Sequence, residues 1–114
     1  MSLTDLGKNK ALDAVLVVEV SLHTEDPTSA GTVGEVAGGS PAYARKAITW
    51  DAAVSGNLNA ATLPVFDIPP STTISHYAFW DASVACMDTG TLDQDQVFAS
   101  QGTYTLTDAD ITIT

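Results

Sequence analysis

His23 and His76 are the only histidines in the sequence, and each is a possible catalytic base. Ser75 directly precedes His76, and adjacent side chains on a strand point to opposite faces, so we predict that the two do not pair. A catalytic base also needs a nucleophile within hydrogen-bonding distance. We therefore interpret His76 as a packed or hydrogen-bonded core histidine and predict no catalytic residues.

The ligand types and their spacing also disfavour a metal site. Cys86 is the only cysteine, and together with two distant histidines it does not supply a tetrahedral zinc site. Calcium takes about six to eight oxygen ligands, more than any of the short acidic pairs provides. We interpret these pairs as caps of turns and strand ends, and we predict neither a metal nor another cofactor. The pairs are Glu25–Asp26, Asp93–Asp95 and Asp108–Asp110.

Carboxylate pairs can also hydrolyse glycosidic bonds, but that reaction needs a cleft, for which a chain of 114 residues has little room. Trp50, Tyr77 and Trp80 could form an aromatic platform for a sugar. We favour a core position for them, because a core of this size requires several buried aromatic side chains. We therefore predict that the protein is not an enzyme.

Charge is distributed unevenly along the chain. The formal net charge is −10, and the four basic residues all precede position 47. An acidic C-terminal half argues against binding to nucleic acid, although it can also simply aid solubility. The sequence contains no apolar run long enough to span a membrane and no signal-peptide pattern, so we expect synthesis in a reducing cytoplasm, no membrane contact and Cys86 as a small core residue.

The apolar pattern predicts one short helix followed by strands. Residues 2–14 are expected to be helical, with Ser2 or Thr4 as the N-cap. Val15–Leu22 alternates with period two, which places Val18 on the apolar face of a strand with Val20. The run 73–87 is the richest in aromatic residues, and we predict a central strand buried on both faces.

Shorter strands are predicted at 43–50, 60–68 and 97–99, and two more within 103–114, with turns at 51–59 and 88–90. Pro64 is expected to place its strand at an edge or a bulge. These elements predict an all-β fold, an antiparallel β-sandwich of jelly-roll or Greek-key type with a short N-terminal helix, in a single domain spanning residues 1–114. The core is predicted to contain Val18, Val20, Phe66, Phe79 and Trp80.

Residues 24–42 form a long arm with two prolines and four glycines. Loops of this length in small domains are usually functional or mobile. The arm has no lysine, so it is not a phosphate-binding loop. Two interpretations remain open: the arm contacts a neighbouring subunit, or it wraps its own domain.

Short strings spread along the chain resemble those of a family of small tailed-phage virion proteins, often labelled tail-fibre-like or minor structural proteins. The resemblance implies a structural component of the virion, assembled in the bacterial host cytoplasm, without catalytic residues and with phage capsid or tail proteins as partners. The strings are LGKN (6–9), ALDA (11–14), LHTEDP (22–27), EV (35–36), GGSPAYAR (38–45), AITW (47–50), ISHY (74–77), FWDA (79–82) and QGTYTL (101–106).

Within that class we favour a capsid decoration protein, because the chain has no coiled coil, collagen repeat or β-helix repeat from which to build a fibre. The alternative is a tail-fibre or tail-tip protein that contributes to binding of a host-surface carbohydrate. We expect a homo-oligomer, a trimer as the first choice, held partly by residues 24–42. The residues expected to contact partners are Lys8, Lys10, Val33, Val36, Tyr43, Arg45 and Lys46.

Overall fold

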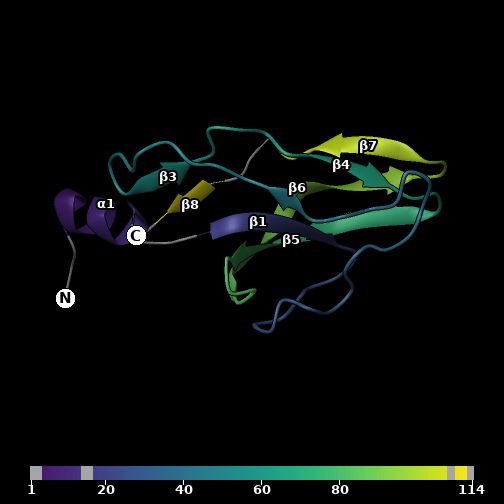
Figure 1. The fold of residues 1–114 in the computed structure, drawn as a ribbon, viewed down its shortest axis with the longest axis horizontal. Coiled ribbons are helices and arrows are strands. Elements are labelled where there is room, and N and C mark those ends of the chain that lie inside the picture. The colour runs from purple at the N-terminus through teal and green to yellow at the C-terminus, as the bar shows by residue number, and fades with distance from the viewer. Residues whose placement is uncertain (1–3, 14–16, 108–109, 113–114) are drawn as a thin grey trace.

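The computed structural model describes residues 4–13, 17–107 and 110–112. These residues form a mostly β structure with one N-terminal helix (Figure 1). Thr4 caps the helix, since its Oγ1 accepts a hydrogen bond from the Gly7 amide at 3.2 Å. The elements are α1 (Asp5–Asp13), β1 (Val17–His23), β2 (Lys46–Ala47), β3 (Asn57–Asn59), β4 (Val65–Ile68), β5 (Thr72–Asp81), β6 (Cys86–Phe98), β7 (Gly102–Thr105) and β8 (Asp110–Thr112).

Four strands form an antiparallel sheet in the order β2-β1-β5-β6, and β4–β7 and β3–β8 form two further pairs. The predicted central strand is confirmed as β5, but it ends at Asp81 and does not continue to residue 87. The Asp81 carboxylate accepts hydrogen bonds from the amides of Ser83 and Ala85, and Val84 has a positive φ of 60°. These features form a tight turn, from which the chain returns as β6.

The core lies between the four-stranded sheet and the β4–β7 pair, which covers one face of that sheet (Figure 1). Phe66 and Ile68 of β4 are fully buried, as the alternation in that strand predicts, and Pro64 lies just before it. Val20 and Phe79 are also fully buried, and Trp80 is 3% exposed, so these predicted core positions are confirmed. The strand order does not establish a jelly roll or a closed sandwich.

The predicted core position of Val18 is wrong. The pairing of β1 with β5 shifts between Val17 and Glu19, which indicates a β-bulge at this point. Val17 is consequently buried, whereas the side chain of Val18 is 38% exposed. Beyond the bulge both faces of β1 are covered, so that Ser21 is as buried as its apolar neighbours.

The sequence placed a turn at 88–90 and a short strand at 97–99, and the structure has instead one long strand, β6, through both segments. Glycine favoured the turn, but Gly90 lies within the ladder opposite Tyr77. The predicted strand at 43–50 is reduced to Lys46–Ala47.

Cys86 is half-buried at the start of β6 and not in the core, with its sulfur close to Gly31 of the arm. Asp108 lies outside the described residues.

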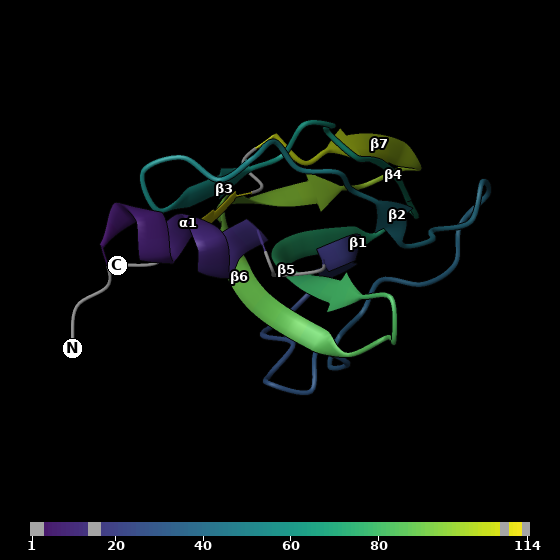
Figure 2. The ribbon, with the colours of Figure 1, turned by 60° about the vertical axis from the view of Figure 1, so that its left-hand side comes forward.

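The molecule is elongated, with extents of 46 × 27 × 25 Å. Helix α1 lies at one end, beside β3 and away from the four-stranded sheet (Figures 1 and 2). The Gly56 amide joins the two by donating to Asn9 Oδ1 at 2.9 Å. Among the residues that the structure describes, α1 is the single helix. It is neither long nor apolar enough to cross a membrane.

Candidate functional site

A groove opens where β6 leaves the regular ladder with β5. Residues 92–95 of β6 lie opposite a single residue of β5, Ser75. This bulge displaces the edge strand locally and creates room beside it. The pairs that flank the bulge are Ile74 with Gln96 and His76 with Thr91.

The groove has a volume of about 540 Å³ and is bounded by β5, β6 and the end of β7. Its apolar part is formed by Leu92 and Leu106, both of which are buried. Tyr77 and Tyr104 are partly buried and pack against the main core, which fixes two aromatic side chains beside the leucines. The remaining lining residues are polar: Thr91, Asp93, Gln94, Gln96, Thr105 and Thr107.

Gly90 provides the space that Tyr77 occupies. A Cβ atom at position 90 would lie 2.3 Å from Cζ of the Tyr77 ring, so only glycine allows the ring to lie across β6. The ring also packs against Phe79, with the ring centroids 5.1 Å apart. On the opposite side, the Leu106 amide donates to the Pro64 carbonyl at 3.0 Å. Both sides of the groove are therefore anchored to the core.

The chemistry of the groove is that of a binding surface for a neutral polar molecule. Its lining has one carboxylate, two primary amides and five hydroxyl groups, three from threonines and two from tyrosines, and no lysine or arginine. Amides donate and accept hydrogen bonds, and the carboxylate of Asp93 accepts them. No group of three His, Cys, Asp or Glu side chains suited to a metal ion occurs in the described part of the chain.

A second polar cluster, which we call the arm clamp, fixes residues 24–42 to the sheet. It is centred on His23, which is fully buried, and its imidazole bridges Ser21 and Val33. Nδ1 lies 2.7 Å from the Val33 carbonyl, which can only accept, so Nδ1 carries the proton. Nε2 then accepts from the Ser21 hydroxyl at 2.7 Å, and Ser21 Oγ accepts from Trp80 Nε1 at 2.8 Å. Burial lowers the pKa of His23, which favours this neutral form.

Glu35, the second anchor of the arm clamp, binds two side chains that follow the arm. Arg45 donates to both of its carboxylate oxygens, at 2.9 and 3.0 Å, and Tyr43 donates a further hydrogen bond at 3.0 Å. Burial opposes ionisation of Glu35, but these hydrogen bonds outweigh it and hold its pKa below the usual range. The Arg45 guanidinium also lies 3.9 Å from the centroid of the Trp80 ring, a cation–π contact.

The arm thus packs against its own chain, and contact of the same arm with a neighbouring subunit stays a prediction. Its backbone is paired on both sides of the turn: the Thr24 amide donates to Gly34, and the Val36 amide donates to Leu22. The Val36 side chain is 5% exposed and belongs to the main core. Pro27 is also buried.

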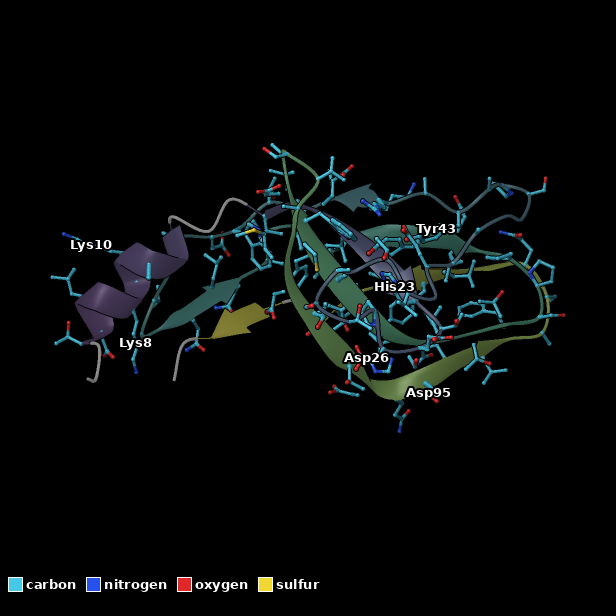
Figure 3. All side chains as sticks on the ribbon, turned by 90° about the horizontal axis from the view of Figure 1, so that it is seen from below. Lys8, Lys10, His23, Asp26, Tyr43 and Asp95 are labelled. Carbon is cyan, nitrogen blue, oxygen red and sulfur yellow. The ribbon has the colours of Figure 1, made fainter. Side chains whose placement is uncertain are left out.

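The structure does not bring the seven expected partner-contact residues together. Tyr43 and Arg45 belong to the arm clamp, while Lys8 and Lys10 lie on α1 at the far end of the molecule (Figure 3). Val36 is in the core, whereas Val33 is 37% exposed. Lys46 lies on β2.

Two features of the site were missed or misjudged from the sequence. Ser75 and His76 were expected not to pair, yet Ser75 Oγ lies 2.7 Å from His76 Nδ1. The pairing shift between Ile74 and His76 breaks the alternation on which that prediction rested. The groove itself was not predicted. The available signal was Gly90 within a strand-like run, since an isolated glycine in a strand often marks a bulge or a close approach.

Comparison with known proteins places the chain among phage fibre proteins. The model of the family described as "Podophage GP4 fiber I protein gp80" matches residues 3–114. No curated protein and no solved structure matches the chain.

A fibre protein agrees with the expected virion location and absence of enzymatic activity, and it favours the tail-fibre alternative over capsid decoration. The absence of a fibrous repeat was a poor guide, because a fibre can also be assembled from globular units. The chain belongs to the podophage GP4 fiber I protein gp80 family and is a non-enzymatic fibre component of a phage virion.

Proposed function

We propose that this protein is a structural unit of a tail fibre, held in place by other virion proteins. The observation that carries the proposal is the extent of the family match, which includes residues 3–114. Helix, sheet and arm therefore all belong to the fibre protein, and none of them is an appended segment. The elongated shape, with extents of 46 × 27 × 25 Å, suits a unit attached at one end.

We infer that the end carrying α1 is the attachment end. Leu6 on α1 is 65% exposed, and Val54, in the turn next to the helix, is 63% exposed. Lys8 and Lys10 balance Asp5 and Asp13 on the same helix, so α1 carries no formal net charge on a protein whose net charge is −10. Exposed apolar side chains on a helix that is less acidic than the chain as a whole suit an acidic protein partner.

The other expected partner-contact residues take different roles in this proposal. Tyr43, Arg45 and Val36 act indirectly, by holding the arm in its folded position. Val33 and Lys46 are more accessible and remain candidates for direct contact with a neighbouring copy.

We further propose a homo-oligomer, with a trimer as the first choice. The four-stranded sheet ends in β2 on one side and β6 on the other, and open sheet edges are sites at which chains associate. Val97 on β6 is 75% exposed, which adds apolar surface near this edge.

Immunogold electron microscopy of virions carrying an epitope-tagged copy tests the location. Label at the tail fibres, with far fewer copies per particle than the major capsid protein, is expected. Label distributed over the capsid at hundreds of copies would contradict the proposal. A virion with a tagged major capsid protein serves as the control for accessibility of the label.

Charge reversal tests the attachment end. We expect Lys8→Glu with Lys10→Glu to fold normally and to be incorporated into particles at a strongly reduced level. The control is Ala99→Glu with Ser100→Glu, in the exposed turn between β6 and β7 at the other end of the molecule (Figure 1). Equal incorporation of both double variants would show that α1 is not the attachment end.

A further inference from the structure

We propose that the groove at the β6 bulge binds a neutral saccharide. This inference deepens the proposed function, since it rests on the protein being exposed on a fibre and adds the site and the class of ligand.

The size and openness of the groove suit a short stretch of a glycan. Its volume of about 540 Å³ lies within the range of about 300–1,000 Å³ that is typical of small-molecule sites. Asp93 and Gln94 are exposed at its rim, so a chain of sugars can enter from the side.

The lining provides both kinds of surface that a sugar ring needs. Sugar rings have an apolar C–H face, which packs on aromatic and aliphatic side chains, here Tyr77, Tyr104 and Leu92. Their hydroxyl groups need partners that donate and accept together, and the amides of Gln94 and Gln96 do both.

The charge of the groove selects for neutral sugars. Asp93 is the charged residue in its lining, and the chain has a net charge of −10. Neither lysine nor arginine lines the groove to bind a phosphate, a sulfate or a sialic acid carboxylate. Anionic glycans would therefore be repelled, whereas a neutral hydroxyl can donate to the Asp93 carboxylate.

The bulge supplies an independent argument. Four residues of β6, 92–95, face only Ser75 of β5, so the edge strand departs far more from regular pairing than a one-residue bulge does. Bulges of this kind commonly occur beside binding sites, where they redirect side chains. Here the departure places the two glutamines and Asp93 around the same groove.

Saturation-transfer NMR on the intact chain tests the proposal. The probes are trisaccharides of glucose, galactose, mannose and N-acetylglucosamine, together with a sialylated trisaccharide as the anionic comparison. We expect saturation transfer to at least one neutral probe and none to the sialylated one. Amide shifts in a ¹⁵N-labelled sample should be confined to residues 91–96 and 104–107.

Matched variants then locate the site. Gln94→Ala with Gln96→Ala should weaken binding at least about tenfold, because each substitution removes hydrogen bonds to the sugar. Asp95→Ala lies in the same bulge but does not line the groove, and its affinity should stay within about twofold of the wild type. Circular dichroism and Tm establish that both variants are folded.

Four results would overturn the proposal: no transfer to any neutral probe, stronger binding of the sialylated probe, equal affinities of the two variants, or burial of residues 91–96 by a second copy in solution. None of these four results would argue against the fibre location, because the immunogold experiment tests location separately. Conversely, label on the capsid would contradict the fibre role even if sugar binding were found.

Discussion

Gly90 shows how the absence of one side chain determines the position of another. It lies opposite Tyr77 in the β5–β6 ladder, and the Tyr77 ring fills the space that a Cβ atom at position 90 would need. Because Tyr77 also packs against Phe79, the ring cannot turn away without disturbing the core. A side chain at position 90 would therefore change both the shape of the groove and the packing of Tyr77 on Phe79.

Gly90→Ala is expected to lower the free energy of unfolding by about 1–3 kcal/mol, the usual cost of forcing an extra methyl group into a packed site. Urea denaturation measures the change. In a Tyr77→Ala background the same substitution should cost much less, because the clashing ring is absent. Equal costs in both backgrounds would show that Tyr77 does not require a glycine at this position.

His23 is expected to make stability depend on pH. Its pKa is lowered in the fold, mainly by burial, so the unfolded chain takes up a proton first as the pH falls. Stability should therefore be greatest above about pH 6.5 and decline as the pH falls from there toward the folded-state pKa. Protonation of Nε2 would leave the Ser21 hydroxyl without its acceptor.

Thermal denaturation between pH 8 and pH 5 measures this decline. His23→Asn should be less stable at high pH but should lack the step below about pH 6.5, whereas the control His76→Asn should retain it. Charged groups near His23 also contribute, since Glu35 favours its protonation while Arg45 and His76 oppose it. An unchanged pH profile in His23→Asn would contradict the assignment.

At the scale of elements, polar contacts hold the arm in addition to the buried side chains of Val36 and Pro27. Glu35 is held by Arg45 and Tyr43, and His23 binds the Val33 carbonyl. These four side chains come from positions 23–45, so the arm and its clamp form one local unit. The clamp keeps residues 24–42 folded on their own chain.

Glu35→Gln should weaken the clamp by about 1–2 kcal/mol, because it removes a bidentate charged pair whose side chains are about a quarter exposed. The expected readout is faster proteolysis within residues 24–34, with little change in the far-UV spectrum. Glu25→Gln, an exposed glutamate of the same arm, is the control and should be cut at the wild-type rate. Equal rates for both variants would show that Glu35 does not hold the arm.

Regular elements could be predicted from the sequence, and departures from regular pairing could not. Alternation correctly placed Phe66 and Ile68 on one face and identified β5 as central. It failed at Val18 and Ser75, where pairing shifts reverse the faces. A bulge is decided by how two distant strands fit together, which local alternation does not record.

The same reason explains why the candidate site was missed. Its lining comes from one bulged strand and from residues 77 and 104–107, which only the folded chain brings together. The sequence suggested either a sugar platform or a core position for Tyr77, and in the structure its ring packs on Phe79 and also lines the groove.

Shortening the bulge tests its role. Removing Asp93 and Gln94 together keeps the inward and outward alternation of β6, because the side-chain period of a strand is two. This deletion should retain the β spectrum and lose saccharide binding. Removing Asp93 alone changes the parity of the strand and should lower Tm further. If the two-residue deletion had a lower Tm than the one-residue deletion, this account of the bulge would be contradicted.

At the scale of the whole molecule, the proposed attachment end and the proposed saccharide groove lie apart. Helix α1, with its exposed Leu6 and its lysines, forms one end (Figures 1 and 2). The groove lies on the sheet, beside an edge strand rich in aspartate. In our proposal, the α1 end contacts an acidic virion protein while the groove on the sheet stays open to solvent.

The most direct test of the fibre role is cryo-electron microscopy of the intact virion, with the tail fibres reconstructed at a resolution that distinguishes strands. We predict density for this chain within a tail fibre, with α1 against a neighbouring virion protein, residues 24–42 folded on their own chain and the groove at residues 91–96 open to solvent. Density for the chain on the capsid surface and not in the fibre would contradict the account.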